Sequence, residues 1–108
     1  MRFKMQHQIE IDSNFMKIAA PVLAEFGFVD TKALIKEQLI LMLASRVSHY
    51  DAEIKLLEEK YGGSYEGLMQ QKQVQEENFD LEDSLNDWRF AIEAARRYQR
   101  KLQEIENA

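Results

Sequence analysis

The stretch ILMLASRVSHYDAEIKLLEEKY, residues 40–61, decides the fold. Its apolar side chains recur at alternating steps of three and four residues, which is the spacing of a helix face packed against another helix. No glycine or proline interrupts residues 31–61, so the sequence predicts one long helix over that range. The apolar seam of this helix consists of Ile40, Leu43, Val47, Tyr50, Ile54, Leu57 and Tyr61.

One part of this predicted helix, residues 39–44, is apolar on all sides rather than along one stripe. A helix without a polar face needs neighbours in several directions, and a single partner helix covers only one of them. We therefore expect the centre of a homodimer here. The expected dimer seam comprises Leu39, Ile40, Met42, Leu43, Val47 and Tyr50.

The residues before the long helix predict a short strand followed by a first helix. Ile9 and Ile11 alternate with polar residues, which indicates a strand over residues 5–12 with one polar face. Asp12 or Ser13 can cap a helix that ends near Phe26, just before Gly27. Because Pro21 falls inside this pattern, the helix either is kinked there or begins near residue 20.

The residues after the long helix predict a connector and a final helix. Two glycines at 62–63 end the long helix, and residues 62–80 form a polar connector in which Ser64 can cap a short helix. From Asp80 to about residue 106, apolar residues keep helical spacing again. The expected fold is mainly α: a short strand, a kinked first helix, and a long second helix packed antiparallel with a long C-terminal helix, in a dimer.

Length and composition predict a single domain and exclude several classes of site. The chain has 108 residues, enough for one domain, and it lacks cysteine, which excludes disulfides and thiolate metal sites. Neither a secretory signal pattern nor an apolar run long enough to span a membrane is present, so we expect a cytoplasmic protein. Residues 1–50 carry six basic and five acidic side chains, whereas residues 51–108 carry eight and fourteen. The second half thus favours a basic protein partner over a nucleic acid.

The predicted strand, the helix ending at Gly27 and the pattern Leu34-Ile35-Lys36-x-x-Leu39 follow one another within residues 5–45. Together they resemble the ribbon-helix-helix DNA-binding unit. This resemblance implies a strand-paired dimer that reads operator DNA, and the alternative is a strand that only tightens a helical dimer. The implied DNA-binding residues are Gln6, Gln8 and Glu10 on the strand, and Thr31 and Lys32 at the start of the long helix.

Tyr50-x-x-Glu53-Ile54 and the segment Asp87-Trp88-Arg89-Phe90 belong to a second set of patterns, which extends over residues 48–108. These patterns resemble small prokaryotic helical proteins that are grouped with the antitoxins of toxin-antitoxin systems. This resemblance implies a protein that sequesters a basic toxin.

An acidic segment, residues 76–83, is the predicted contact with such a partner. It interleaves apolar residues with five carboxylates, so it can mimic nucleic acid in a cationic groove, although the same residues also suit an acidic helix start. Phe90 lies off the main apolar stripe of the final helix and is the candidate exposed anchor. The predicted partner-binding residues are Glu76, Glu77, Phe79, Asp80, Leu81, Glu82, Asp83 and Phe90.

The sequence indicates no enzyme, cofactor or metal site. His49 and Glu53 lie one helical turn apart, but a single such pair lacks the further ligands of a carboxylate metal site and is typical of an exposed intrahelical pair. The predicted function is a non-enzymatic, antitoxin-like protein that dimerises, sequesters a basic partner and binds operator DNA. The alternative is a helical adaptor that binds proteins without a DNA role.

Overall fold

The computed structural model describes residues 12–72 and 79–108, and every secondary-structure element in these ranges is a helix. In order they are α1 (Ser13–Glu25), α2 (Thr31–Tyr61), α3 (Tyr65–Lys72) and α4 (Phe79–Glu106). The strand predicted over residues 5–12 lies outside the described residues except for Asp12. Backbone contacts divide the chain into two compact units, Met1–Glu37 and Gln38–Ala108, which are described separately below. The sequence predicts a dimerising part with ribbon-helix-helix-like character in residues 1–50 and an acidic partner-binding part in residues 51–108, and this boundary does not test that division.

Helix α1 begins at Ser13, directly after one of the two predicted capping residues. The Asp12 carboxylate accepts a hydrogen bond from the backbone N–H of Phe15 at 2.7 Å, so Asp12 rather than Ser13 is the N-cap. The helix includes Pro21, which rules out a start near residue 20; the predicted kink stays a prediction. Gly27, with φ of 92°, ends the helix in a left-handed conformation that a side chain would disfavour.

Helix α2 has the predicted bounds, residues 31–61. The Asp30 carboxylate accepts a hydrogen bond from the N–H of Ala33 at 2.9 Å and caps its start. At its end, Gly62 has φ of 70° and donates its N–H to the carbonyl of Glu58 at 2.8 Å. The unbroken run of helix-compatible residues and the two end signals therefore fix the length of α2 together.

The connector contributes a short helix to the fold, and the final helix follows it as predicted. Ser64 caps α3 by accepting a hydrogen bond from the N–H of Gly67 at 3.1 Å. Helix α4 begins one residue before the predicted start, so Asp80 lies inside its first turn. The positive end of the helix dipole stabilises carboxylates in this first turn.

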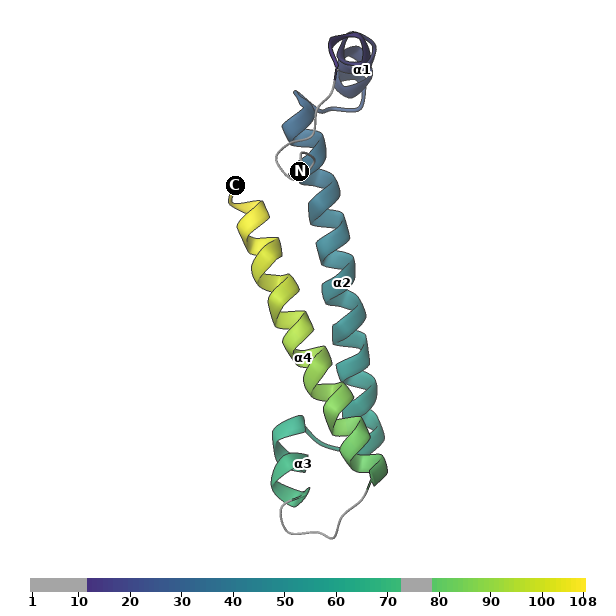
Figure 1. Cartoon of the computed structure of the whole chain (residues 1–108), viewed down its shortest axis with the longest axis vertical. Helices are drawn as coiled ribbons and strands as arrows, with labels where there is room; N and C mark the ends of the chain where they lie inside the picture. The colour runs from purple at the N-terminus through teal and green to yellow at the C-terminus, as the bar shows by residue number, and fades with distance from the viewer. Residues whose placement is uncertain (1–11, 73–78) are drawn as a thin grey trace, which may run out of the picture. The chain divides into compact units, whose positions relative to one another are not determined.

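Within the unit Gln38–Ala108, α4 runs antiparallel beside α2, and α3 lies beside the first turns of α4 (Figure 1). Two contacts show this pairing of α2 with α4 directly. The hydroxyl of Tyr61 donates a hydrogen bond to Oγ of Ser84 at 2.7 Å. The ring of Tyr50 stacks on that of Tyr98, with centroids 6.0 Å apart. The predicted antiparallel packing of the two long helices is confirmed.

The core lies where α2, α3 and α4 meet, and Trp88 is its centre. Trp88 has no exposed surface and is the largest fully buried side chain among the described residues. Tyr61 stacks on it from α2, and Tyr65 from α3 meets it edge to face. The buried members of this cluster are Leu68, Leu81, Leu85 and Trp88, with Ile54, Leu57, Tyr61, Tyr65, Met69 and Ile92 packed against them.

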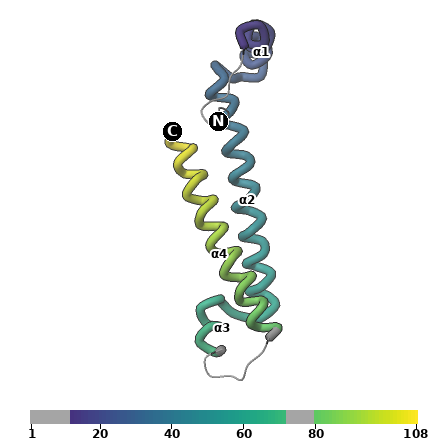
Figure 2. Tube along the Cα trace, in the orientation of Figure 1, coloured from purple at the N-terminus to yellow at the C-terminus, as the bar shows by residue number. Residues whose placement is uncertain are grey.

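Burial decreases along α4 toward its C-terminus. Beyond the core, small residues let α2 approach, and Ala91, Ala94 and Ala95 are buried. After Ala95 no residue of α4 is buried, although Leu102 and Ile105 are only half-exposed. Figure 2 shows the trace of α4 drawing away from α2 in this part. The last three turns of the pair therefore leave apolar surface uncovered.

We expect Trp88→Ala to lower the free energy of unfolding by about 3 to 5 kcal/mol, because it empties the centre of the core. Urea denaturation followed by circular dichroism, at one fixed protein concentration, measures this loss. The control is Arg89→Ala at the adjacent exposed position, which should change the free energy by less than about 0.5 kcal/mol. Equal losses in the two variants would contradict the position of Trp88.

Candidate protein interaction surfaces

An apolar groove lies between α2 and α4 near the C-terminus of α4. Its volume is about 340 Å³, and apolar side chains from both helices form most of its wall. Arg46 and Lys101 stand at its edge and supply positive charge. Such a surface, apolar in the middle and charged at the rim, has the composition of a protein interface. The groove is lined by Leu39, Met42, Leu43, Arg46, Tyr98, Lys101 and Ile105.

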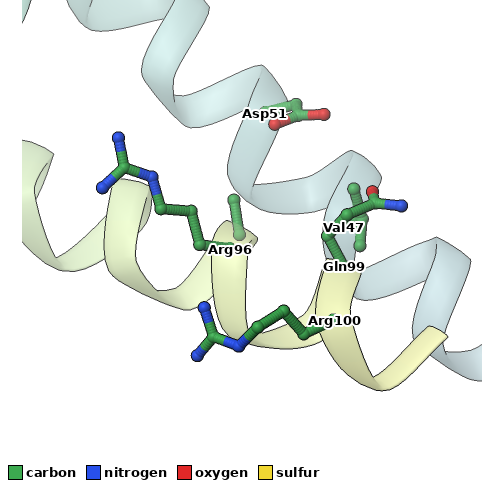
Figure 3. Close-up of a pocket in the computed structure, with 6 residues that line it drawn as sticks. Val47, Asp51, Arg96, Gln99 and Arg100 are labelled. Atoms are coloured by element: carbon green, nitrogen blue, oxygen red, sulfur yellow. The ribbon is translucent and has the colours of Figure 1, made fainter. Parts of the chain in front are cut away.

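A second groove of about 350 Å³ lies between the same helices, and two arginines of α4 are among the residues that line it. Figure 3 shows Arg96 and Arg100 extending from α4 toward the same side, with Asp51 on α2 across from them. No ion pair joins either arginine to another described residue. These guanidinium groups are therefore available to solvent or to an acidic partner.

In the unit Met1–Glu37, α1 exposes its apolar side. Phe15, Ile18, Val22 and Phe26 have 47 to 73% of their surface exposed. A groove of about 340 Å³ with a wholly apolar character runs along this side, where the start of α2 supplies Thr31 and Leu34. Exposed apolar patches of this kind mark interaction sites.

The residues of the predicted dimer seam fall into two groups. Val47 and Tyr50 face α4 of the same chain, because Tyr50 contacts two rings there and Val47 lines a groove with Ala95. Met42 is 62% exposed. The intrachain helix pair therefore takes up part of the predicted seam, and the uncovered remainder lies near residue 42. Leu39, Ile40 and Leu43 are half-buried.

The predicted partner-binding segment is described only in part. Glu76 and Glu77 lie outside the described residues, and Phe79 is placed only as the first residue of α4. Asp80 and Asp83 are exposed in the first turns of this helix, and Glu82 is half-buried. Leu81 packs in the core beside Leu85, so the fold itself holds this side chain. Phe90 is 56% exposed, as its place off the main stripe predicts.

Of the predicted DNA-binding residues, Gln6, Gln8 and Glu10 lie outside the described residues. Thr31 is half-buried, and its hydroxyl donates to the sulfur of Met16 at 3.7 Å. Lys32 is exposed. The Asp30 carboxylate occupies the N-terminus of α2, where a phosphate would have to bind, so repulsion works against a phosphate at this point.

His49 and Glu53 form a side-chain pair on α2. Nε2 of His49 and Oε2 of Glu53 are 2.8 Å apart on an exposed helix face, as predicted for an intrahelical pair. In the described ranges, no three or more His, Asp or Glu side chains are arranged so that they could hold a metal ion. In residues 12–72 and 79–108, no helix has the length and apolarity that crossing a membrane requires.

One structural feature was missed by the sequence reasoning. Phe90, Ala94 and Tyr98 form a second stripe on α4, next to the core stripe that contains Trp88, and the ring of Tyr50 contacts both Phe90 and Tyr98. Their spacing of four residues is visible in the sequence. Because an alanine separates the two rings, the stripe does not stand out as an apolar run.

Comparisons with known proteins return no relative: no family model matches the chain, and neither a curated protein nor a solved structure shows significant similarity to it.

Proposed function

We propose that this chain is a non-enzymatic protein interaction module that acts as a homodimer and, like an antitoxin, sequesters a basic protein partner. One observation carries the proposal. Among the 31 residues of α2, all of which the structure describes, none is buried. A helix with an apolar seam of this length contributes to stability by burying that seam. In this chain it lacks enough neighbours to do so.

The exposed apolar side chains support self-association. Leu41, Met42 and Leu56 on α2 and Phe90 on α4 each have more than half of their surface exposed. Placing one such side chain in an interface contributes about 1.5 to 3 kcal/mol. A few of them are enough for a stable dimer, after the entropy cost of association is subtracted.

The acidic second half supports a basic partner. Asp80 and Asp83 are exposed on the first turns of α4, and Glu58 and Glu59 are exposed on the last turns of α2. Carboxylates at this end of the helix pair attract a cationic groove and accelerate encounter with it. The antitoxin role rests on this charge and on the resemblance of residues 48–108.

Operator binding stays a prediction, because the strand that would read DNA is outside the described residues and Asp30 caps α2. A mobility shift with the chain's own promoter decides it: sequence-selective retardation that weakens with salt would establish DNA binding. Without such retardation, the chain acts as a helical adaptor that binds proteins alone.

The first test of the proposal concerns oligomeric state. Wild-type protein should have the mass of a dimer in size-exclusion chromatography with light scattering. Met42→Lys should weaken the dimer about tenfold or more, because a charge replaces an exposed apolar side chain without affecting the core.

The matched control for this test is Ser48→Lys, an equal gain of charge at an exposed position of the same helix. It should keep the wild-type mass. A well-folded wild-type monomer at all measured concentrations would refute self-association.

The second test concerns the acidic end. Reversing Glu76, Glu77 and Asp80 to lysine should slow association with the protein encoded by the neighbouring gene and make the remaining rate nearly independent of salt, because electrostatic steering is lost. Stopped-flow or surface plasmon resonance measures the rate.

The control reverses Glu93, Glu104 and Glu106 instead, which changes the net charge by the same amount in the second half of α4. Its association rate should fall much less. Equal rates for the two triple variants, with circular dichroism showing intact helices, would reject a localised acidic contact.

A further inference from the structure

Helix α1 has two apolar sides, and only one of them faces the start of α2. Met16, Ala19 and Leu23 are half-buried on the first side, where the hydroxyl of Thr31 donates to the sulfur of Met16 at 3.7 Å. No residue of α1 is buried, although the structure describes the whole helix. The second side is open to solvent and carries the α1 ridge, which consists of Phe15, Ile18, Val22 and the C-cap residue Phe26.

The α1 ridge borders an apolar groove within the unit Met1–Glu37. Phe15, Ile18 and Val22 line this groove together with Leu34 of α2, and its volume is about 340 Å³. No charged side chain is among its lining residues, so it offers no group that would bind a charged ligand. A groove between two helices with this lining suits the apolar side chains of a further amphipathic helix.

The α1 ridge has the form of such an occupant, and it is symmetric along the helix. Phenylalanines stand at its two ends, at 15 and 26, and the β-branched Ile18 and Val22 stand between them. Both pairs are centred near residue 20. A two-fold axis that passes beside α1 at this level, at right angles to the helix, would set α1 of a second copy antiparallel to it. Each phenylalanine would then meet the other phenylalanine of the second copy, and Ile18 would meet Val22.

The residues that flank the α1 ridge fit this antiparallel direction. Asn14 and Glu25 are eleven residues apart, which is about three helical turns, so both lie on one flank of the ridge, opposite the flank that faces α2. Both are exposed, and their midpoint is also near residue 20. An antiparallel two-fold pair sets equal flanks side by side. The Glu25 carboxylate would therefore lie beside the Asn14 amide of the second copy, which donates a hydrogen bond.

Within its own chain, Glu25 occupies an unfavourable position. It is the last residue of α1, where the helix dipole is negative, and no basic side chain lies in that turn. It forms no ion pair with a described residue. A donor near the positive end of a second copy of α1 would therefore stabilise this carboxylate, since the Asp12 carboxylate at that end is already bonded to the N–H of Phe15.

We propose that α1 binds α1 of a second copy of this chain in the antiparallel direction, with the ridge of each copy in the groove of the other. This inference rests on the proposed self-association, and it adds a contact in the unit Met1–Glu37 to the one expected near Met42. Both copies contribute the same patch, as an isologous two-fold interface requires. The first turn of α2 from each copy lies on the apolar flank of the pair, where Leu34 extends the contact.

The parallel arrangement lacks these polar contacts. If two copies of α1 ran in the same direction about an axis along the helices, opposite flanks would meet, and Glu25 would lie against the flank of the second copy that carries Leu23. A carboxylate placed against apolar groups without a donor opposes association. The aligned dipoles of parallel helices would oppose it as well. The ridge therefore supplies affinity, and the polar flank supplies direction.

A charge at the centre of the α1 ridge tests the contact in the full chain. Ile18→Lys should weaken the homodimer about tenfold or more, because it places two lysines in an apolar interface. Sedimentation velocity over a range of protein concentrations measures the dissociation constant, and circular dichroism checks that the helix content is unchanged.

The matched control is Ala24→Lys, the same gain of charge at an exposed position of α1, six residues from Ile18 and off the ridge. Its dimer should keep the wild-type affinity. Equal affinities of the two variants would overturn the pairing of α1 while leaving self-association intact. A monomeric wild-type protein would instead overturn the proposed function itself.

Cross-linking tests the direction, because the chain contains no cysteine of its own. Asn14→Cys and Glu25→Cys both leave the ridge intact. In an equimolar mixture, a short bismaleimide should join the two variants to each other, since positions 14 and 25 of opposite copies lie at nearly the same level. Either variant alone should be joined poorly, because the two copies of one position are about 15 Å or more apart along the pair. A mixture that is cross-linked no better than the single variants would overturn the antiparallel arrangement.

Discussion

A helix that packs against one neighbour leaves most of its circumference exposed, and this geometric constraint governs the unit Gln38–Ala108. Where three helices meet, around Trp88, side chains are fully buried. Where α2 and α4 are alone together, burial depends on alanines at 91, 94 and 95 that allow close approach. Beyond Ala95 no residue of α4 is buried. The extent to which each helical turn is buried therefore follows the number of helices that pack against it.

The helix bounds and the antiparallel pairing of the two long helices could be predicted from the sequence, but the packing of α3 into the core could not. Caps and glycines act within a few residues, so Asp30 and Gly62 specify the bounds of α2 locally. The spacing of Trp88 and its stripe likewise identifies the buried side of α4. No local signal states which helix covers which apolar residue, so the role of α3 in the core was not foreseen.

The candidate surfaces were predictable to a similar degree. The sequence marks residues 39–44 as needing several neighbours, and Met42 is indeed exposed in the single chain. It also identifies Phe90 as exposed. It does not show that Tyr50 lies level with Ala94, because this depends on the register between two helices far apart in sequence.

The account depends on a second copy completing the burial of α2, so stability must be coupled to association. The most direct measurement is the thermal unfolding midpoint over a hundredfold range of protein concentration, followed by circular dichroism. The account predicts a midpoint that rises steadily with concentration, by several degrees, because mass action favours the folded dimer. A midpoint independent of concentration, in a protein that unfolds cooperatively, would contradict it.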